Sequence, residues 1–169
     1  MNQIFQYPIN EKLSEAVLFI LKNTKASNIG RKKLAKLLYF ADFKHYKKTY
    51  NSITGEQYSR WEYGPFPKKL YPTLDYLKAK GQIKIEDVKY AEEKIGKNMT
   101  ILKTFEPTHL SQEEQDDILS ILAKLGSFTG KQLEDLSHDD TPWQVTGEQN
   151  IIDYDLVFYR DEETIEQVE

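Results

Sequence analysis

Apolar residues recur every three to four positions along much of the chain, and this spacing predicts a mainly helical protein. The first stretch covers residues 11–22, and Asn10 is placed to cap its N-terminus. The longest stretch covers residues 31–50 and is apolar around most of its girth. A helix of that kind is usually central to a core, so we expect residues 31–50 to be buried.

A loop rich in aromatic residues and proline covers residues 58–67 and precedes the third predicted helix. Leu70, Leu74 and Leu77 give this helix its apolar face. Gly81 follows, where a helix commonly ends in a left-handed residue. We therefore expect an irregular loop and then a short helix.

Capping signals mark the helices of the second half. Ser111 is followed three residues later by Glu114, which is the pattern of a capping box. The residues expected to face inward from the helix that it opens are Ile118, Leu119, Ile121, Leu122 and Leu125. Thr129 and Thr141 are placed to cap two further short helices.

Alternating apolar and polar residues predict two strands, at 82–86 and 99–105, joined by a polar tip. The fold class is therefore mainly α (α+β): a compact helical domain with a small antiparallel hairpin. This order of elements is compatible with a winged helix. We expect a single domain over residues 1–160, followed by an acidic tail over residues 161–169 that frays.

Composition excludes several kinds of chemistry. The chain has 169 residues and no cysteine, which excludes disulfides, thiolate catalysis and zinc sites built on cysteine. No apolar run reaches the roughly 18 residues of a transmembrane helix. The N-terminus lacks the basic and apolar segments of a signal peptide. We therefore expect a cytoplasmic protein that does not associate with a membrane.

The net charge of −4 conceals an uneven distribution. Residues 1–105 carry 20 Lys and Arg against 10 Asp and Glu, whereas residues 106–169 carry 3 against 17. Such asymmetry indicates either a charged partner or an acidic tail. The alternative is that the two halves attract each other within one fold.

No pattern requires a nucleotide, a metal ion or catalysis. Residues 126–132, GSFTGKQ, have one residue too few for a phosphate-binding loop, and Gln132 replaces the magnesium ligand. His138, Asp139 and Asp140 could bind a metal, although such a cluster more often caps a turn. We expect no cofactor, no metal and no enzyme. A hydrolase that uses His138 and a nearby aspartate is the enzymatic alternative.

DNA binding is the strongest alternative from the residues alone. A helix followed by a hairpin is the order of a winged helix-turn-helix, and Lys68, Lys69 and Lys78 could contact phosphates there. Against this interpretation, residues 67–80 contain no Arg, Asn or Gln that could read bases. The protein is also acidic overall, so DNA is the less favoured partner.

Three short motifs carry a family resemblance. They are a Lys-Leu-Leu-Tyr-Phe helix, an aromatic-x-Tyr-Gly-Pro loop before a helix that contains tyrosine, and a Ser/Thr-His-x-x-x-Pro-Trp element. The matching residues are Lys36, Leu37, Leu38, Tyr39, Phe40, Trp61, Tyr63, Gly64, Pro65, Tyr71, Ser137, His138, Pro142 and Trp143. In this order and spacing, over roughly residues 11–160, they resemble the Panacea domain of the SocA-like antitoxins. Phe66 departs from the valine that is frequent in that family.

The resemblance implies an antitoxin of a bacterial or phage toxin–antitoxin pair. Members of the family neutralise many unrelated toxins by protein–protein contact, and these toxins include small alarmone-synthetase-like enzymes. The partner expected here is a cognate toxin that could be an enzyme handling nucleotides or RNA. One branch resembles an adaptor that delivers its toxin to a ClpXP-type protease. The family motif residues are expected to be mostly structural.

Two expectations follow for the surfaces of such a protein. Trp61 and Tyr63 alternate, so they could pin one face of the 58–67 loop to the core, with Trp143 nearby. Gly64 and Pro65 would make this loop a fixed corner of the scaffold. The alternative is that the loop itself binds a partner. The acidic half could compete for a basic toxin surface through Asp116, Asp117, Asp139 and Asp140.

Overall fold

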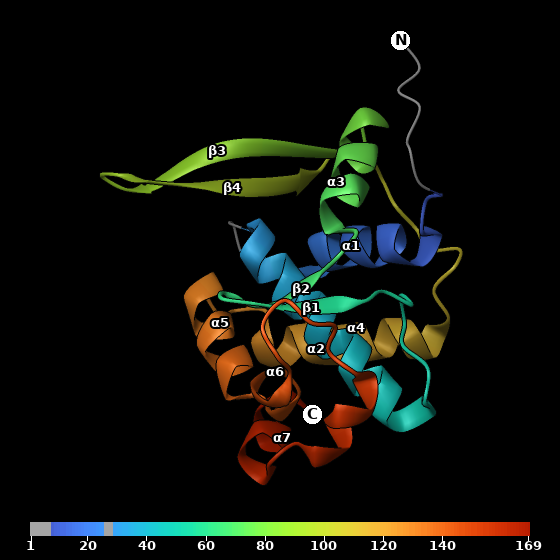
Figure 1. The fold of residues 1–169 in the computed structure, drawn as a ribbon. Helices are drawn as coiled ribbons and strands as arrows, with labels where there is room; N and C mark the ends of the chain where they lie inside the picture. The colour runs from blue at the N-terminus through green and yellow to red at the C-terminus, as the bar shows by residue number, and fades with distance from the viewer. Residues whose placement is uncertain (1–7, 26–28) are drawn as a thin grey trace.

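The computed structural model describes residues 8–25 and 29–169, which fold as a mainly helical protein with two small antiparallel hairpins (Figure 1). The helices are α1 (Glu11–Asn23), α2 (Arg31–Thr49), α3 (Leu70–Ala79), α4 (Gln112–Leu125), α5 (Gly130–Asp139), α6 (Thr141–Val145), the 3-10 helix η1 (Tyr154–Tyr159) and α7 (Glu162–Val168). The strands are β1 (Tyr58–Trp61), β2 (Gly64–Pro67), β3 (Ile83–Ala91) and β4 (Lys94–Ile101). The predicted fold class is confirmed.

Helix α2 lies at the centre of the protein, and α1, α4, α5, β2 and η1 all pack against it (Figure 1). The apolar girth seen in the sequence explains this position, because α2 is buried on nearly every side from Lys33 to Phe43. The buried apolar side chains of the described residues form a single cluster around this helix.

Local capping places the helix ends where the sequence predicts them. Asn10 Oδ1 accepts a hydrogen bond from the Leu13 amide and begins α1. Capping boxes begin α4 at Ser111 and α5 at Thr129. Gly81 follows the end of α3 with a φ of 66°. The prediction that Leu119 faces inward is wrong, because this side chain is exposed on α4.

Residues 58–67 form a hairpin instead of an irregular loop. Strands β1 and β2 are antiparallel, and Trp61 pairs with Gly64 at the turn. Pro65 and Pro67 obscure this strand in the sequence, because proline removes a donor and is tolerated only at a sheet edge. The hairpin lies between α2 and α3, so these helices are not joined by the short turn of a helix-turn-helix.

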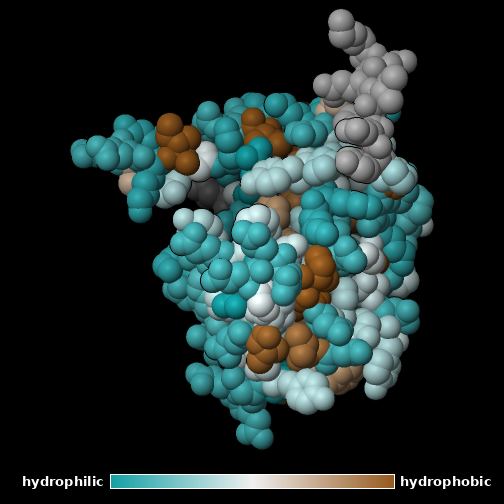
Figure 2. Space-filling model, in the orientation of Figure 1, coloured by the Kyte–Doolittle hydropathy of each residue, from teal (hydrophilic) through white to brown (hydrophobic). Residues whose placement is uncertain are grey.

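The second hairpin is longer than predicted. Strands β3 and β4 continue through the residues expected to form a polar tip, and they pair from Ile83 with Ile101 out to Ala91 with Lys94. The hairpin projects from the body as an arm (Figures 1 and 2). Its base is attached through the Met99 amide, which donates to the carbonyl of Ile29.

The acidic C-terminal segment is ordered, so the prediction of a frayed tail is wrong. Residues 162–168 form α7, which packs against α4 and buries Val168 completely. Glu169 contacts both Lys47 and Arg160. These ion pairs explain why a segment of acidic composition is held against the body.

Candidate partner-binding groove

The first turn of α2, the β1–β2 hairpin and the start of α3 enclose a groove of about 660 Å³, which we call the aromatic groove. Its lining residues are Arg31, Lys32, Lys36, Ser59, Trp61, Tyr63, Gly64, Phe66, Lys68 and Tyr71. None of its described lining residues is acidic. The loop motif of the family resemblance supplies three of these residues, Trp61, Tyr63 and Gly64.

The aromatic side chains of this motif face solvent. Trp61 is 50% exposed, Tyr63 58% and Tyr71 48%. The expectation that Trp61 and Tyr63 pin the loop to the core is therefore wrong. Both residues are exposed and line the same groove. Phe66, which is half-buried, packs beside Tyr71 with 5.3 Å between ring centroids.

The hairpin that carries the aromatic residues is held rigidly from beneath. Gly64 has a φ of 98°, a conformation that residues with a side chain rarely adopt. A Cβ at this position would lie 2.6 Å from Lys36 Cε and closer still to Ser137 Oγ. Only glycine fits here, so Gly64 and the buried Pro65 do form the expected fixed corner.

Lys36 fastens this corner to α2. Its side chain is 1% exposed, and its Nζ donates a hydrogen bond of 2.9 Å to the carbonyl of Pro65. Burial lowers the pKa of Lys36 to about 7, although the negative charge of Glu134 acts in the opposite direction. A lysine within the apolar run of α2 is the sequence signal for this role.

Trp143 supports the hairpin from its other side, as expected from the sequence. Its Nε1 donates to the Trp61 carbonyl at 3.1 Å. Its ring stacks on His138 at 4.4 Å, and the Arg60 guanidinium lies 4.2 Å from the ring centroid. The backbone of Trp61 is thus fixed while its side chain projects outward.

The helical part of the family motif forms the core below the groove. Leu37, Leu38, Tyr39 and Phe40 are all fully buried. Tyr39 donates a hydrogen bond of 2.7 Å to Asp140.

Two of the four aspartates proposed to bind a toxin are not accessible. Asp140 is completely buried and receives two hydrogen bonds from Arg160, at 2.7 and 2.9 Å. Asp117 is buried as well, where it pairs with His45 at 2.7 Å and with Lys48 at 2.8 Å. These carboxylates hold the fold together and cannot face a partner. Asp116 and Asp139 are exposed, on α4 and α5 respectively.

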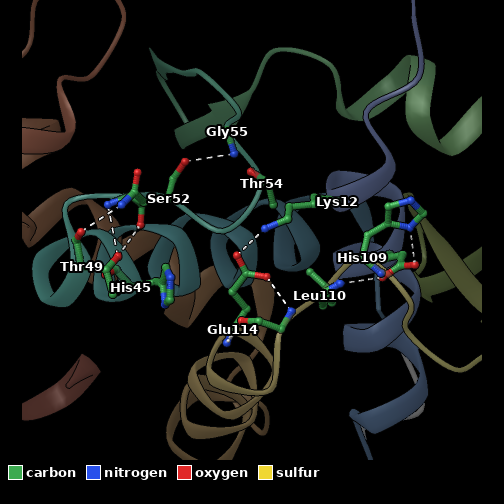
Figure 3. A network of polar contacts seen from close by, with 12 residues as sticks. Lys12, His45, Thr49, Ser52, Thr54, Gly55, His109, Leu110 and Glu114 are labelled. Carbon is green, nitrogen blue, oxygen red and sulfur yellow. Dashed lines mark hydrogen bonds and ion pairs between the residues drawn. The ribbon is translucent and has the colours of Figure 1, made fainter.

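Part of the charge asymmetry is used in ion pairs inside the fold. Lys12 on α1 pairs with Glu114 on α4 at 2.5 Å, and Figure 3 shows the two side chains reaching toward each other. Lys32 pairs with Glu134 in the same way. The alternative that the basic and acidic halves attract each other is therefore confirmed.

Glu15 makes a further connection between the halves. Its carboxylate accepts hydrogen bonds from the backbone amides of Thr108, His109 and Leu110, at 2.8 to 3.0 Å. Burial alone would raise the pKa of Glu15, but the bonds from His109 and Thr108 outweigh it and lower the pKa to about 2.

The lysines considered for DNA binding are exposed but do not form one surface element. Lys68 and Lys69 precede α3 and are not part of it, while Lys78 lies in its last turn. Of the four lysines on the arm that would act as the wing, Lys84 pairs with Glu86 and Lys97 with Asp87, while Lys89 and Lys94 are exposed. A nucleic-acid interface needs a more continuous basic surface.

The residues considered for metal or hydrolytic chemistry lie outside the aromatic groove. His138 stacks on Trp143, and its buried Nε2 has no hydrogen-bond partner. Glu134 and Asp135 lie within 4.8 Å of it, but both carboxylates pair with lysines. The GSFTGKQ segment spans the end of α4 and the capping box of α5, with no preceding strand.

The sequence-based reasoning missed Arg31, Lys32 and Phe66 as members of a site. Arg31 and Lys32 were visible only as basic residues at the end of a helix.

None of the helices that the structure describes is long and apolar enough to cross a membrane.

The described residues form a mainly helical scaffold that presents an exposed aromatic groove on a constrained hairpin. A family model described as "Antitoxin SocA-like, Panacea domain" matches residues 34–144, which is about two thirds of the chain and includes all three motifs. The chain belongs to this family, and a role related to toxin–antitoxin systems follows from that membership. No curated protein and no solved structure matches the chain.

Proposed function

We propose that the chain is an antitoxin that neutralises a cognate protein toxin by direct binding, and that the aromatic groove is the contact surface. The observation that carries the proposal is the exposure of Trp61, Tyr63 and Tyr71 on a backbone that is rigid. Exposed aromatic residues are commonly the energetic centre of protein interfaces. The proposal assigns no catalytic step to this chain.

Rigidity supports a binding role for the groove. Lys36, Gly64 and the Trp143–Trp61 hydrogen bond fix the hairpin before any partner arrives. A preorganised surface loses little conformational entropy on binding, which increases affinity. Burying the three aromatic side chains against a partner would also remove the largest exposed rings of the family motif from water.

The test is co-expression of this chain with the product of the adjacent reading frame, followed by growth measurement and pull-down. We expect growth to be restored and the two proteins to co-purify. Trp61→Ala and Tyr63→Ala should each weaken the complex by about 30-fold or more, as a hot-spot residue does. Tyr90→Ala and Tyr159→Ala are matched controls, because both tyrosines are exposed and lie outside the groove.

The same experiment separates direct blocking from proteolytic delivery. Direct blocking predicts that growth is restored equally in a host that lacks the ClpXP protease. Rescue that disappears in that host would favour the adaptor alternative. Failure of the two proteins to associate would refute the proposal for that partner. A complex that tolerates both groove substitutions would move the contact surface elsewhere.

A further inference from the structure

The charges that line the aromatic groove indicate what kind of segment it takes. Arg31 and Lys68 have no carboxylate partner among the described residues, in contrast to Lys32, which pairs with Glu134. The Arg31 guanidinium lies 4.8 Å from the centroid of the Tyr71 ring, and its buried Nε has no hydrogen-bond partner in the described part of the chain. The groove therefore contains positive charge that this chain does not neutralise.

The end of α2 adds to this positive potential. Its first turn contains no acidic side chain, and the N-cap residue Gly30 provides no side-chain acceptor. The N-terminus of a helix carries a partial positive charge, which here lies beside Arg31 and Lys32. A carboxylate in the groove would interact favourably with both the helix end and the free guanidinium.

The remaining walls are aromatic. Trp61, Tyr63, Phe66 and Tyr71 offer ring faces that suit apolar or aromatic side chains. A volume of about 660 Å³ is the size of a site for a small ligand or a few side chains. A groove of this size does not correspond to a flat interface between two globular surfaces.

Recognition must occur through side chains, because the edges of the β1–β2 sheet are in use. The outer edge of β1 bonds residues 149–152, through pairs that include the Ile152 amide and the Tyr58 carbonyl. At β2, the Pro65 carbonyl is bonded by Lys36. A partner strand therefore cannot extend this sheet in the manner of β-augmentation.

We propose that the aromatic groove binds an acidic peptide segment of the toxin, in which carboxylates flank an aromatic or large apolar side chain. The apolar side chain packs among Trp61, Tyr63 and Tyr71, and a carboxylate is held by Arg31 and Lys68. This inference rests on the proposed antitoxin function and defines the chemistry of its contact. It replaces the expectation that acidic residues of this chain face a basic toxin.

The test uses charge reversal on the complex isolated with the adjacent gene product. Arg31→Glu and Lys68→Glu should each raise the dissociation constant about tenfold or more, and binding should weaken as salt rises from 50 to 300 mM. Glutamate is well tolerated in the first turn of a helix, so Arg31→Glu should fold. Lys78→Glu and Lys84→Glu are the matched controls, since both lysines are exposed and outside the groove.

Peptides identify the segment directly. Fifteen-residue peptides tiling the adjacent gene product are tested for binding to the wild type and to Arg31→Glu. We expect the peptides that bind only the wild type to contain at least two acidic residues beside an aromatic or large apolar residue. Fluorescein-labelled dT12 is tested in parallel, because an oligonucleotide is the other anionic and stacking ligand that such a groove could hold.

Each outcome has a distinct meaning. A stable complex whose affinity is unchanged in both charge-reversal variants overturns the acidic peptide and leaves the antitoxin function standing. Selection of basic or uncharged peptides also overturns it. Binding of dT12 that competes with the partner and is lost in Arg31→Glu assigns the groove to nucleic acid. Absence of any complex overturns both the peptide and the proposed function.

Discussion

Replacing Lys36 with methionine should stabilise the protein at neutral and mildly acidic pH. Lys36 is 1% exposed, and its Nζ donates to the uncharged carbonyl of Pro65 at 2.9 Å. A buried ammonium group is poorly compensated by a neutral acceptor. Methionine is unbranched and of similar length, so Lys36→Met removes the charge with little change in packing.

The magnitude follows from the pKa of Lys36, which burial lowers from 10.5 to about 7. Such a shift corresponds to about 5 kcal/mol, because each pKa unit is worth about 1.4 kcal/mol. The folded protein binds this proton less tightly than the unfolded chain, so the destabilisation is complete below pH 7 and is relieved as the pH rises from 7 to 10.5. Loss of the hydrogen bond to Pro65 costs about 1–3 kcal/mol. The variant should therefore be more stable by roughly 2–4 kcal/mol at pH 6.

Urea unfolding of both proteins at several pH values between 6 and 10 tests this reasoning. The advantage of Lys36→Met should shrink steadily above pH 7 and reach zero between about pH 8 and pH 10, where the remaining charge penalty equals the cost of the lost hydrogen bond. Lys78→Met is the control, because Lys78 is exposed and its substitution should change stability little at any of these pH values. A stability difference between wild type and Lys36→Met that stays constant across this range would refute the account.

Three further predictions concern residues that hold the fold. Glu15→Gln should destabilise the folded protein by about 3 kcal/mol at pH 7, and this loss of stability should fade as the pH drops from 4.5 toward 2, since the folded pKa of Glu15 is about 2. Urea unfolding of wild type and variant at pH 7 and pH 3 measures the stability difference, and equal differences at both pH values would contradict the prediction. Gly64→Ala should lower the melting temperature by several degrees more than Gly55→Ala, because both positions have positive φ but only Gly64 lacks space for a Cβ. Arg160→Met should destabilise the folded protein by about 3–5 kcal/mol, because the buried carboxylate of Asp140 loses its cationic partner. Adding Asp140→Asn to this variant should recover part of the lost stability in thermal unfolding. No recovery would rule out the unpaired charge as the cause.

The elements that were predictable are those encoded by neighbouring residues. The α1 cap at Asn10 and the capping boxes at Ser111 and Thr129 depend on residues three positions apart, so the sequence reveals them directly. The apolar residues around most of the girth of α2 likewise predict its central position in the core. The β1–β2 hairpin was hidden because Pro65 and Pro67 are poor strand residues, and only the packing of β2 on α2 makes the pairing favourable.

The burial of individual charges was not predictable, because the partners are distant in sequence. Asp117 is held by Lys48 and His45, about seventy positions earlier in the chain. Asp140 is held by Arg160 and by Tyr39, 101 positions away. Judged from their neighbours in the sequence alone, both aspartates are typical of a solvated helix face. No local pattern distinguishes them from the exposed Asp116 and Asp139.

The groove-forming hairpin combines several features that lower the stability of the folded protein. A lysine is buried without a carboxylate bound to it, a glycine is held at positive φ where no side chain fits, and three large aromatic side chains are left in water. Each feature is unfavourable for stability by itself, and all of them meet at one hairpin. Natural proteins depart from local preferences mainly where function requires it. The convergence at Lys36 and Gly64 therefore supports the proposal that the β1–β2 hairpin contacts a partner.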